Sequence, residues 1–115
     1  APFHCELIRN ASIKLEDEIA NQKFNNFVFP LYSNVTAEHC NSQTIKNLLV
    51  KQIISRVRWR ESIENMIRDG INCFIEIGPG NVLTNLIKRI NREVKAISVS
   101  SIEDLEKIKF AKLDS

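Results

Sequence analysis

The spacing of apolar and polar residues predicts a helix near the start of the chain. Charged residues separate apolar ones that recur every three or four positions: Ile8, Ala11, Leu15 and Ile19. This spacing predicts an amphipathic helix over about residues 7–21. The next segment, FVFPLYSN at 27–34, is rich in aromatic and branched residues and predicts a strand that ends at Asn34. Pro30 has no backbone N–H to donate, which favours an edge position or a bulge.

Two more helices are predicted in the middle of the chain. The first follows Ser42, a plausible N-cap, and its pattern fades near Ser55. One face of this helix carries Ile45, Leu48, Leu49 and Ile53. Gln52 falls on the same face. The second helix covers about Ser62 to Asp69, points Ile63, Met66 and Ile67 inward, and ends at Gly70, because glycine tolerates a left-handed backbone.

The last third of the chain alternates strands and helices. CFIEI at 73–77 predicts a buried strand, GPGN a tight turn with Asn81 near an N-cap, and KAISV at 95–99 a second strand. The helix between them has an apolar stripe of Val82, Leu83, Leu86, Ile87 and Ile90. SIEDLEKIKF forms the final helix, with Ser101 and Asp104 spaced as a capping box. We therefore expect parallel pairing of the two strands across a helix, in a layered α/β architecture with a right-handed crossover.

The length and charge of the chain limit the number of folding units and the kinds of partner to be expected. A chain of 115 residues is expected to be one folding unit or a piece of one. Its net charge of +2 is too small to indicate nucleic acid or an anionic membrane as a partner. No apolar run approaches the ~20 residues that span a bilayer. The chain lacks an initiator Met and begins directly in a motif, so we expect it to start partway through a longer protein.

The cysteines suggest reduced thiols. Cys5, Cys40 and Cys73 form an odd set without a CxxC pair, which argues against a disulfide framework and a zinc cluster and favours a cytoplasmic setting. The neighbouring pairs His4-Cys5 and His39-Cys40 have the right chemistry for zinc, but adjacent residues rarely converge on one ion. For a similar reason Cys5 is not expected to be a nucleophile activated by His4.

His4 and Gln52 are the first candidate site. A histidine at a helix start can simply cap or pack, and a glutamine on an apolar face can simply bond to nearby backbone. The alternative rests on position, because a carbonyl in the last turn of a helix has no partner within that helix. The helix end also carries about half a negative charge, which suits an imidazole that holds a proton transiently. The Gln52 carbonyl could therefore orient His4 as aspartate does in a Ser-His-Asp triad.

Two other motifs have simpler explanations. GPGN could cradle a phosphate, but it lacks the Lys and Ser/Thr of a Walker loop and the third glycine of a dinucleotide site. A strand-to-helix turn explains it better. RVRWR at 56–60 could bind nucleic acid through its arginines and a stacking ring, or it could point Val57 and Trp59 inward with solvated arginines. The small net charge favours the second interpretation.

Several stretches together resemble the malonyl-CoA:acyl carrier protein transacylases of bacterial fatty-acid synthesis. They are PFHCEL, SNV, LLVKQI, VRWRESIENM and FIEIGPGNVLTNLIKRI. They follow the family's order and cover nearly the whole chain, but match only the C-terminal part of that family. The resemblance implies an acyltransferase core of the α/β-hydrolase type that is incomplete without its upstream half, and a parent enzyme that is cytoplasmic and monomeric.

The resemblance also implies roles for particular residues. His4 matches the general base that serves first a serine and then the incoming thiol, and Gln52 matches the residue whose main-chain carbonyl orients that histidine. Phe3 matches a position that is phenylalanine in malonyl-selective relatives and more often serine where branched acyl groups are accepted. Lys88 and Arg89 match basic positions proposed to meet the acidic carrier protein. The substrates implied are malonyl-CoA and phosphopantetheinylated acyl carrier protein, with no cofactor and no metal.

One departure limits these expectations. No serine in the chain lies in the Gly-His-Ser-x-Gly elbow of the family, and the carboxylate-binding arginine, the oxyanion segments and the ferredoxin-like subdomain are absent. We therefore expect the isolated chain to supply only the histidine half of the mechanism and to be inactive. The alternative is a binding module that docks an acidic protein or nucleic acid through its basic residues: Arg56, Arg58, Arg60, Lys88 and Arg89.

Overall fold

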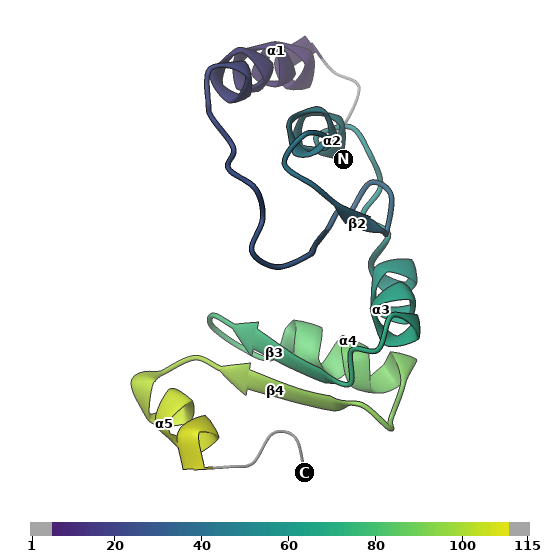
Figure 1. The fold of residues 1–115 in the computed structure, drawn as a ribbon, viewed down its shortest axis with the longest axis vertical. Helices are drawn as coiled ribbons and strands as arrows, with labels where there is room; N and C mark the ends of the chain where they lie inside the picture. Colours follow the sequence, from purple (N-terminus) through teal and green to yellow (C-terminus); the bar gives the residue numbers. More distant parts are fainter. Residues whose placement is uncertain (1–5, 111–115) are drawn as a thin grey trace. The chain divides into compact units, whose positions relative to one another are not determined.

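A computed structural model describes residues 6–110 of the chain (Figure 1). The helices are α1 (Glu6–Ala20), α2 (Ile45–Gln52), α3 (Trp59–Arg68), α4 (Val82–Ile90) and α5 (Ile102–Phe110). The strands are β1 (Leu31–Tyr32), β2 (His39–Cys40), β3 (Cys73–Ile77) and β4 (Lys95–Val99). These elements form two compact units, where the length of the chain suggested one. We call residues 1–65 unit 1 and residues 66–115 unit 2, so that the division falls within α3.

In unit 1, α1 and α2 pack against each other. Ile19 of α1 and Ile45 of α2 are buried, as their apolar patterns predicted. The Lys46 ammonium donates to the carbonyl of Ala20 at 3.2 Å, which satisfies an acceptor at the end of α1. The helix predicted over residues 7–21 is therefore confirmed to within one residue at each end.

The strand predicted at 27–34 is much shorter than expected. Only Leu31 and Tyr32 pair with another strand, antiparallel to Cys40 and His39. The residues before them form no strand, and Val28 is 87% exposed. Pro30 directly precedes β1 and cannot donate to a ladder, so pairing begins only after it.

Asn41, and not Ser42, organises the start of α2. The Asn41 Oδ1 accepts from the backbone N–H groups of Gln43 and Thr44 at 3.0 and 3.1 Å. Thr44 is the N-cap residue, while the Ser42 hydroxyl instead donates to the Asn26 side chain at 3.2 Å. The expected Ser42 cap was wrong because Asn41 already satisfies the amide groups that such a cap would bind.

α3 begins before the predicted Ser62 and ends as predicted. The Ser62 N–H and hydroxyl both donate to the Arg58 carbonyl, at 2.9 and 2.7 Å, so the helical bonding starts at Arg58. At the other end Gly70 has φ +102°. Its N–H donates to the Ile67 carbonyl, and the Ile71 N–H donates to that of Met66, both at 3.0 Å. This is the pair of bonds of a Schellman motif.

Unit 2 is a β-α-β-α unit, and its parallel pairing is confirmed. β3 and β4 pair from Cys73 with Lys95 to Ile77 with Val99. α4 packs on both strands and α5 on β4. β3 was expected to be buried, but Ile75 and Ile77 are 43% and 83% exposed. β3 is therefore only partly buried.

The first turn of α5 has half of the predicted capping box. The Asp104 N–H donates to the Ser101 hydroxyl at 3.1 Å, as the motif requires. The Asp104 carboxylate, however, accepts from the N–H and hydroxyl of Ser100, both at 3.1 Å, and so reaches one residue further back. These bonds lower the pKa of Asp104.

Candidate functional site

Gln52 is the candidate catalytic residue that the structure describes, whereas Phe3, His4 and Cys5 lie outside residues 6–110. Gln52 is the last residue of α2, so its carbonyl lies at the helix end, as expected from the sequence. Its side chain is exposed, so the argument from the cost of burying an amide does not apply. The argument from the backbone remains.

The end of α2 is loosely bonded. The N–H groups of Ile53, Ile54 and Ser55 donate to carbonyls three residues earlier, at 3.3, 3.2 and 3.4 Å. The longest of these contacts goes to the Gln52 carbonyl, which was expected to have no such partner. A carbonyl oxygen has two lone pairs, so this one can accept a second hydrogen bond, for example from an imidazole.

The Glu76 carboxylate binds the start of α4, directly after the GPGN turn that was considered as a phosphate site. Its carboxylate accepts from the Thr84 N–H at 2.9 Å, the Thr84 hydroxyl at 2.8 Å and the Leu83 N–H at 3.3 Å. These bonds, first of all the one from the Thr84 backbone, lower the pKa of Glu76. Because a carboxylate occupies the amides of the α4 N-terminus, the structure favours the strand-to-helix turn over the phosphate cradle.

The expected Asn81 cap is only partly right. Asn81 is the N-cap residue by position, but its side chain makes no capping bond. Glu76 of β3 supplies that bond from eight residues before Thr84. The sequence contains a hint of this role, since Glu76 is the one charged residue in an otherwise apolar strand pattern.

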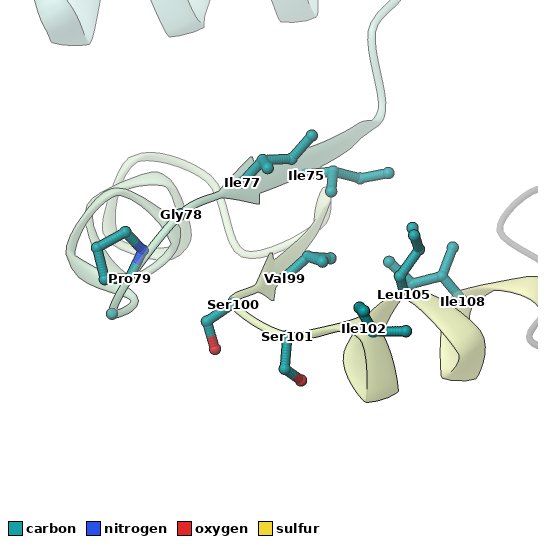
Figure 2. Close-up of a pocket in the computed structure, with 11 residues that line it drawn as sticks. Ile75, Ile77, Gly78, Pro79, Val99, Ser100, Ser101, Ile102, Leu105 and Ile108 are labelled. Carbon is teal, nitrogen blue, oxygen red and sulfur yellow. The ribbon is translucent and has the colours of Figure 1, made fainter.

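An apolar groove lies beside the same turn (Figure 2). It has a volume of about 820 Å³. Ile75 and Ile77 of β3, Val99 of β4 and side chains of α5 line it, with Ser100 and Ser101 nearer the turn. Ile102 and Leu105 of α5 are 76% and 50% exposed. The groove is therefore an open apolar surface of unit 2.

The basic residues divide into two groups. Arg56 and Arg58 pair with Glu61, and Arg60 pairs with Glu64 at 2.9 Å. Lys88 and Arg89 are exposed in the last turn of α4 and, with Arg92 and Val94, line a hollow of about 540 Å³. Within residues 6–110, no carboxylate forms an ion pair with these three cations. The pairing of Arg56, Arg58 and Arg60 leaves the nucleic-acid alternative without support.

His39 and Cys40 do not form a metal site with other described residues. His39 packs edge-on against Tyr32, with ring centroids 6.0 Å apart. Burial raises the pKa of the Cys40 thiol. Among residues 6–110 there is no cluster of three metal-ligating side chains. No helix among these residues is long and apolar enough to cross a membrane.

Comparison with known proteins identifies close relatives, although no family model matches the chain. The malonyl CoA-acyl carrier protein transacylase of Bacillus subtilis (strain 168) is 42% identical over 106 residues, which are 91% of this chain and 33% of that protein. The enzyme of the same name from Staphylococcus aureus (strain MSSA476) is 39% identical over 106 residues, which are 34% of that protein.

Solved structures agree in fold as well as in sequence. The acyl-carrier-protein-S-malonyltransferase of Bartonella henselae has a TM-score of 0.85 and 38% identity, over 94% of this chain and 35% of that one. The malonyl CoA-acyl carrier protein transacylase of Clostridium perfringens has a TM-score of 0.84 and 38% identity, over 96% and 35%. The chain is thus similar to these transacylases in both sequence and fold. It spans about a third of their length, matching the C-terminal part.

The family and the partial α/β fold expected from the sequence are thus confirmed. Three features of the transacylase-like chain were not anticipated. They are the Glu76 cap of α4, Arg92 beside Lys88 and Arg89, and the contacts that Arg58 makes with the turn at 33–38. The first had a weak signal in the sequence. The others depend on which residues fold together.

Proposed function

We propose that the chain is the C-terminal part of a malonyl-CoA:acyl carrier protein transacylase and supplies the histidine half of a Ser-His mechanism. The observation that carries the proposal is the 42% identity over 91% of the chain, together with a TM-score of 0.85 to a solved acyl-carrier-protein-S-malonyltransferase. The chain has no Gly-His-Ser-x-Gly elbow and matches about a third of each relative, so the nucleophile is proposed to lie in a part of the enzyme that this chain does not match.

In the proposed reaction, a serine hydroxyl attacks the malonyl thioester of coenzyme A. His4 accepts the serine proton and returns it to the departing coenzyme A thiol, leaving a malonyl-serine ester. The phosphopantetheine thiol of the carrier protein then attacks this ester. His4 takes the proton of that thiol and returns it to serine as the ester bond breaks. Both steps exchange one acyl bond for another, so no cofactor or metal is required.

The Gln52 carbonyl is proposed to accept a hydrogen bond from the second imidazole nitrogen of His4. This bond would fix the ring tautomer and stabilise the imidazolium, as the aspartate does in a serine protease. The partial negative charge at the end of α2 would act in the same direction. Phe3 is proposed to favour the malonyl group over branched acyl groups.

Lys88 and Arg89 are proposed to dock the acidic carrier protein, and we add Arg92 to this set. The three cations surround one hollow and have no carboxylate partner among the described residues. Opposite charges across an interface raise the rate of encounter more than the final affinity. No nucleic-acid partner is proposed. We expect the whole enzyme to be a cytoplasmic monomer.

A chimeric enzyme tests the proposal. The matching third of the Bacillus subtilis relative is replaced by this chain, and malonyl transfer from coenzyme A to carrier protein is measured. We expect an active chimera in which His4→Ala lowers kcat by about a hundred- to ten-thousandfold, the usual contribution of a general base. The isolated chain should form no malonyl-carrier protein, because it lacks a nucleophile and an oxyanion site.

The chain offers a matched control, since it contains one other histidine, His39. His39 packs on Tyr32 and has no proposed role in catalysis, so His39→Ala should keep the activity of the chimera. A His4→Ala chimera as active as the parent would refute the histidine mechanism. Malonyl transfer by the isolated chain would refute the proposed division of labour.

A further inference from the structure

A tight turn at residues 33–38 connects β1 to β2 in unit 1. The Ser33 N–H donates to the Glu38 carbonyl at 3.0 Å, and the Ala37 N–H donates to the Ser33 carbonyl at 2.9 Å. Ala37 is fully buried and has φ +59°, a left-handed conformation that costs a residue with a Cβ atom about 1 kcal/mol. A backbone in this conformation persists only when its surroundings fix it.

Contacts from Arg58, which directly precedes α3, and from Asn65 within α3 fix this turn by binding a run of its carbonyl oxygens. The Arg58 N–H donates to the Asn34 carbonyl at 3.2 Å. The Arg58 Nη1 donates to the Thr36 carbonyl at 3.2 Å and lies 3.5 Å from that of Val35. The next carbonyl, that of Ala37, accepts from the Asn65 side chain at 2.8 Å. Consecutive acceptors from 34 to 37 are therefore satisfied from residues 58 and 65.

Glu61 holds the Arg58 guanidinium in place for these contacts. Its carboxylate accepts from Arg58 Nε and also pairs with Nη2. Both side chains are 38% exposed. A planar guanidinium with its donors in a fixed fork can bind a carboxylate on one side and backbone carbonyls on the other, which an ammonium cannot do with the same geometry. Arg58 is thus a fixed point that joins the turn to α3.

This fixed point lies at the end of the segment that follows Gln52. The last bonds of α2 run between residues three apart and lengthen to 3.4 Å at Gln52. The direction of the Gln52 carbonyl therefore depends on the path of residues 53–58. One hydrogen bond near the helix restricts that path: the Ser55 hydroxyl donates to the Lys51 carbonyl at 2.6 Å. Arg58 holds its far end.

We infer that Arg58 is a positioning residue for the Gln52 carbonyl, through its hold on the turn at 33–38. The inference rests on the proposed function, because it matters for catalysis only if that carbonyl orients His4. Arg58 itself need not touch the substrate. Its loss should leave binding of malonyl-CoA unchanged and slow the step in which the imidazole must be correctly placed.

The test uses the chimeric enzyme described above. Arg58→Ala should lower kcat by about ten- to a hundredfold, as misplacement of a catalytic group by about 1 Å does. The KM for malonyl-CoA should stay unchanged. Activity is normalised to active sites counted from the burst of malonyl-enzyme, so that a variant that merely folds poorly shows fewer sites and an unchanged kcat per site.

Two conservative variants grade the effect. Arg58→Lys keeps the charge but not the fork, and should keep an intermediate kcat. Glu61→Gln keeps an acceptor for the guanidinium, so its kcat should fall less than the kcat of Arg58→Ala. Arg60→Ala is the matched control, because Arg60 pairs with Glu64 on the same helix and makes no hydrogen bond to the described residues of the turn. Its kcat should be unchanged.

The outcomes separate this inference from the proposed function. If His4→Ala abolishes activity while Arg58→Ala and Arg60→Ala both keep full kcat per site, only the role of Arg58 is refuted. A rise in KM without a fall in kcat for Arg58→Ala would also refute positioning of the base. If His4→Ala keeps its activity, the proposed function itself fails, whatever Arg58 does.

Discussion

Different kinds of bonds stabilise the interior of each of the two units. In unit 2, β3 and β4 pair through their backbones over five residues each, with α4 packed against both. Unit 1 has two strands of only two residues, and side chains bind backbone carbonyls across it. Arg58 and Asn65 hold the turn at 33–38, and Lys46 binds the end of α1. One unit is built mainly by regular pairing and the other by particular side chains.

This difference affects how each unit carries function. The proposed basic docking surface of unit 2 lies on a helix that a strand, a turn and a capping carboxylate position locally. The proposed histidine-orienting carbonyl of unit 1 lies at a loosely bonded helix end. Its position depends on contacts between residues far apart in sequence. A single substitution should therefore disturb the site in unit 1 more easily than the one in unit 2.

The largest expected effect tests whether the units are independent in stability. Ile63 is 2% exposed, and Ile63→Ala should lower the free energy of unfolding of unit 1 by about 2–5 kcal/mol, because it removes buried methyl groups and leaves a cavity. Urea unfolding followed through Trp59, the single tryptophan, reports on unit 1.

Amide hydrogen exchange in β3 and β4 reports on unit 2 in the same sample and should change little. Ile87→Ala is the matched variant, since Ile87 is 5% exposed in α4, and it should give the reverse result. If each variant lowers the stability of both units equally, the two units unfold as one and the comparison fails.

A smaller and pH-dependent effect is expected at the Glu76 cap. Hydrogen bonds hold the pKa of Glu76 below its usual value in the folded chain. Its contribution to stability is therefore present above the ordinary glutamate pKa and is lost as the pH falls through the lowered one. Glu76→Gln should destabilise α4 at pH 7 and make little difference in strong acid.

Urea unfolding at several pH values, read from exchange of α4 amides, measures this effect. Glu16→Gln in α1 changes an exposed carboxylate of unit 1 and should leave those amides unaffected. A Glu76→Gln variant that is as stable as the parent at pH 7 would show that the carboxylate cap adds nothing. Asp104 also has a lowered pKa, so the stability of the parent chain should still fall in acid whether or not the Glu76 cap contributes.

The smallest effect on stability is expected at the open groove. Ile77 is 83% exposed, so Ile77→Ser should change the free energy of unfolding by no more than about 0.5 kcal/mol. It should nevertheless reduce self-association, because exposed apolar patches of this kind promote contacts between molecules. Sedimentation of the purified chain over a range of concentrations measures this change.

Val28→Ser provides the comparison in unit 1, where Val28 is 87% exposed and lines a different hollow. It should reduce association less than Ile77→Ser. A larger reduction from Val28→Ser would place the association surface in unit 1 and not on the sheet of unit 2.

The regular elements were determined by the sequence to a large extent. The helix at α1, the β3-α4-β4 order and the end of α3 at Gly70 all followed from local patterns, because helical spacing and glycine conformation depend on neighbouring residues. The position of Gln52 at a helix end was equally local. The family resemblance could likewise be stated from the short sequences around these elements.

The tertiary structure decided what the side chains bind. Ser42 bonds to Asn26 and does not cap α2, Glu76 in place of Asn81 caps α4, and Arg58 binds a turn more than twenty residues away. Each choice depends on which donor and acceptor folding brings within about 3 Å, and spacing along the chain does not contain that distance. The exposure of Ile75 and Ile77 was hidden for the same reason, because an apolar strand pattern does not show which of its faces another element covers.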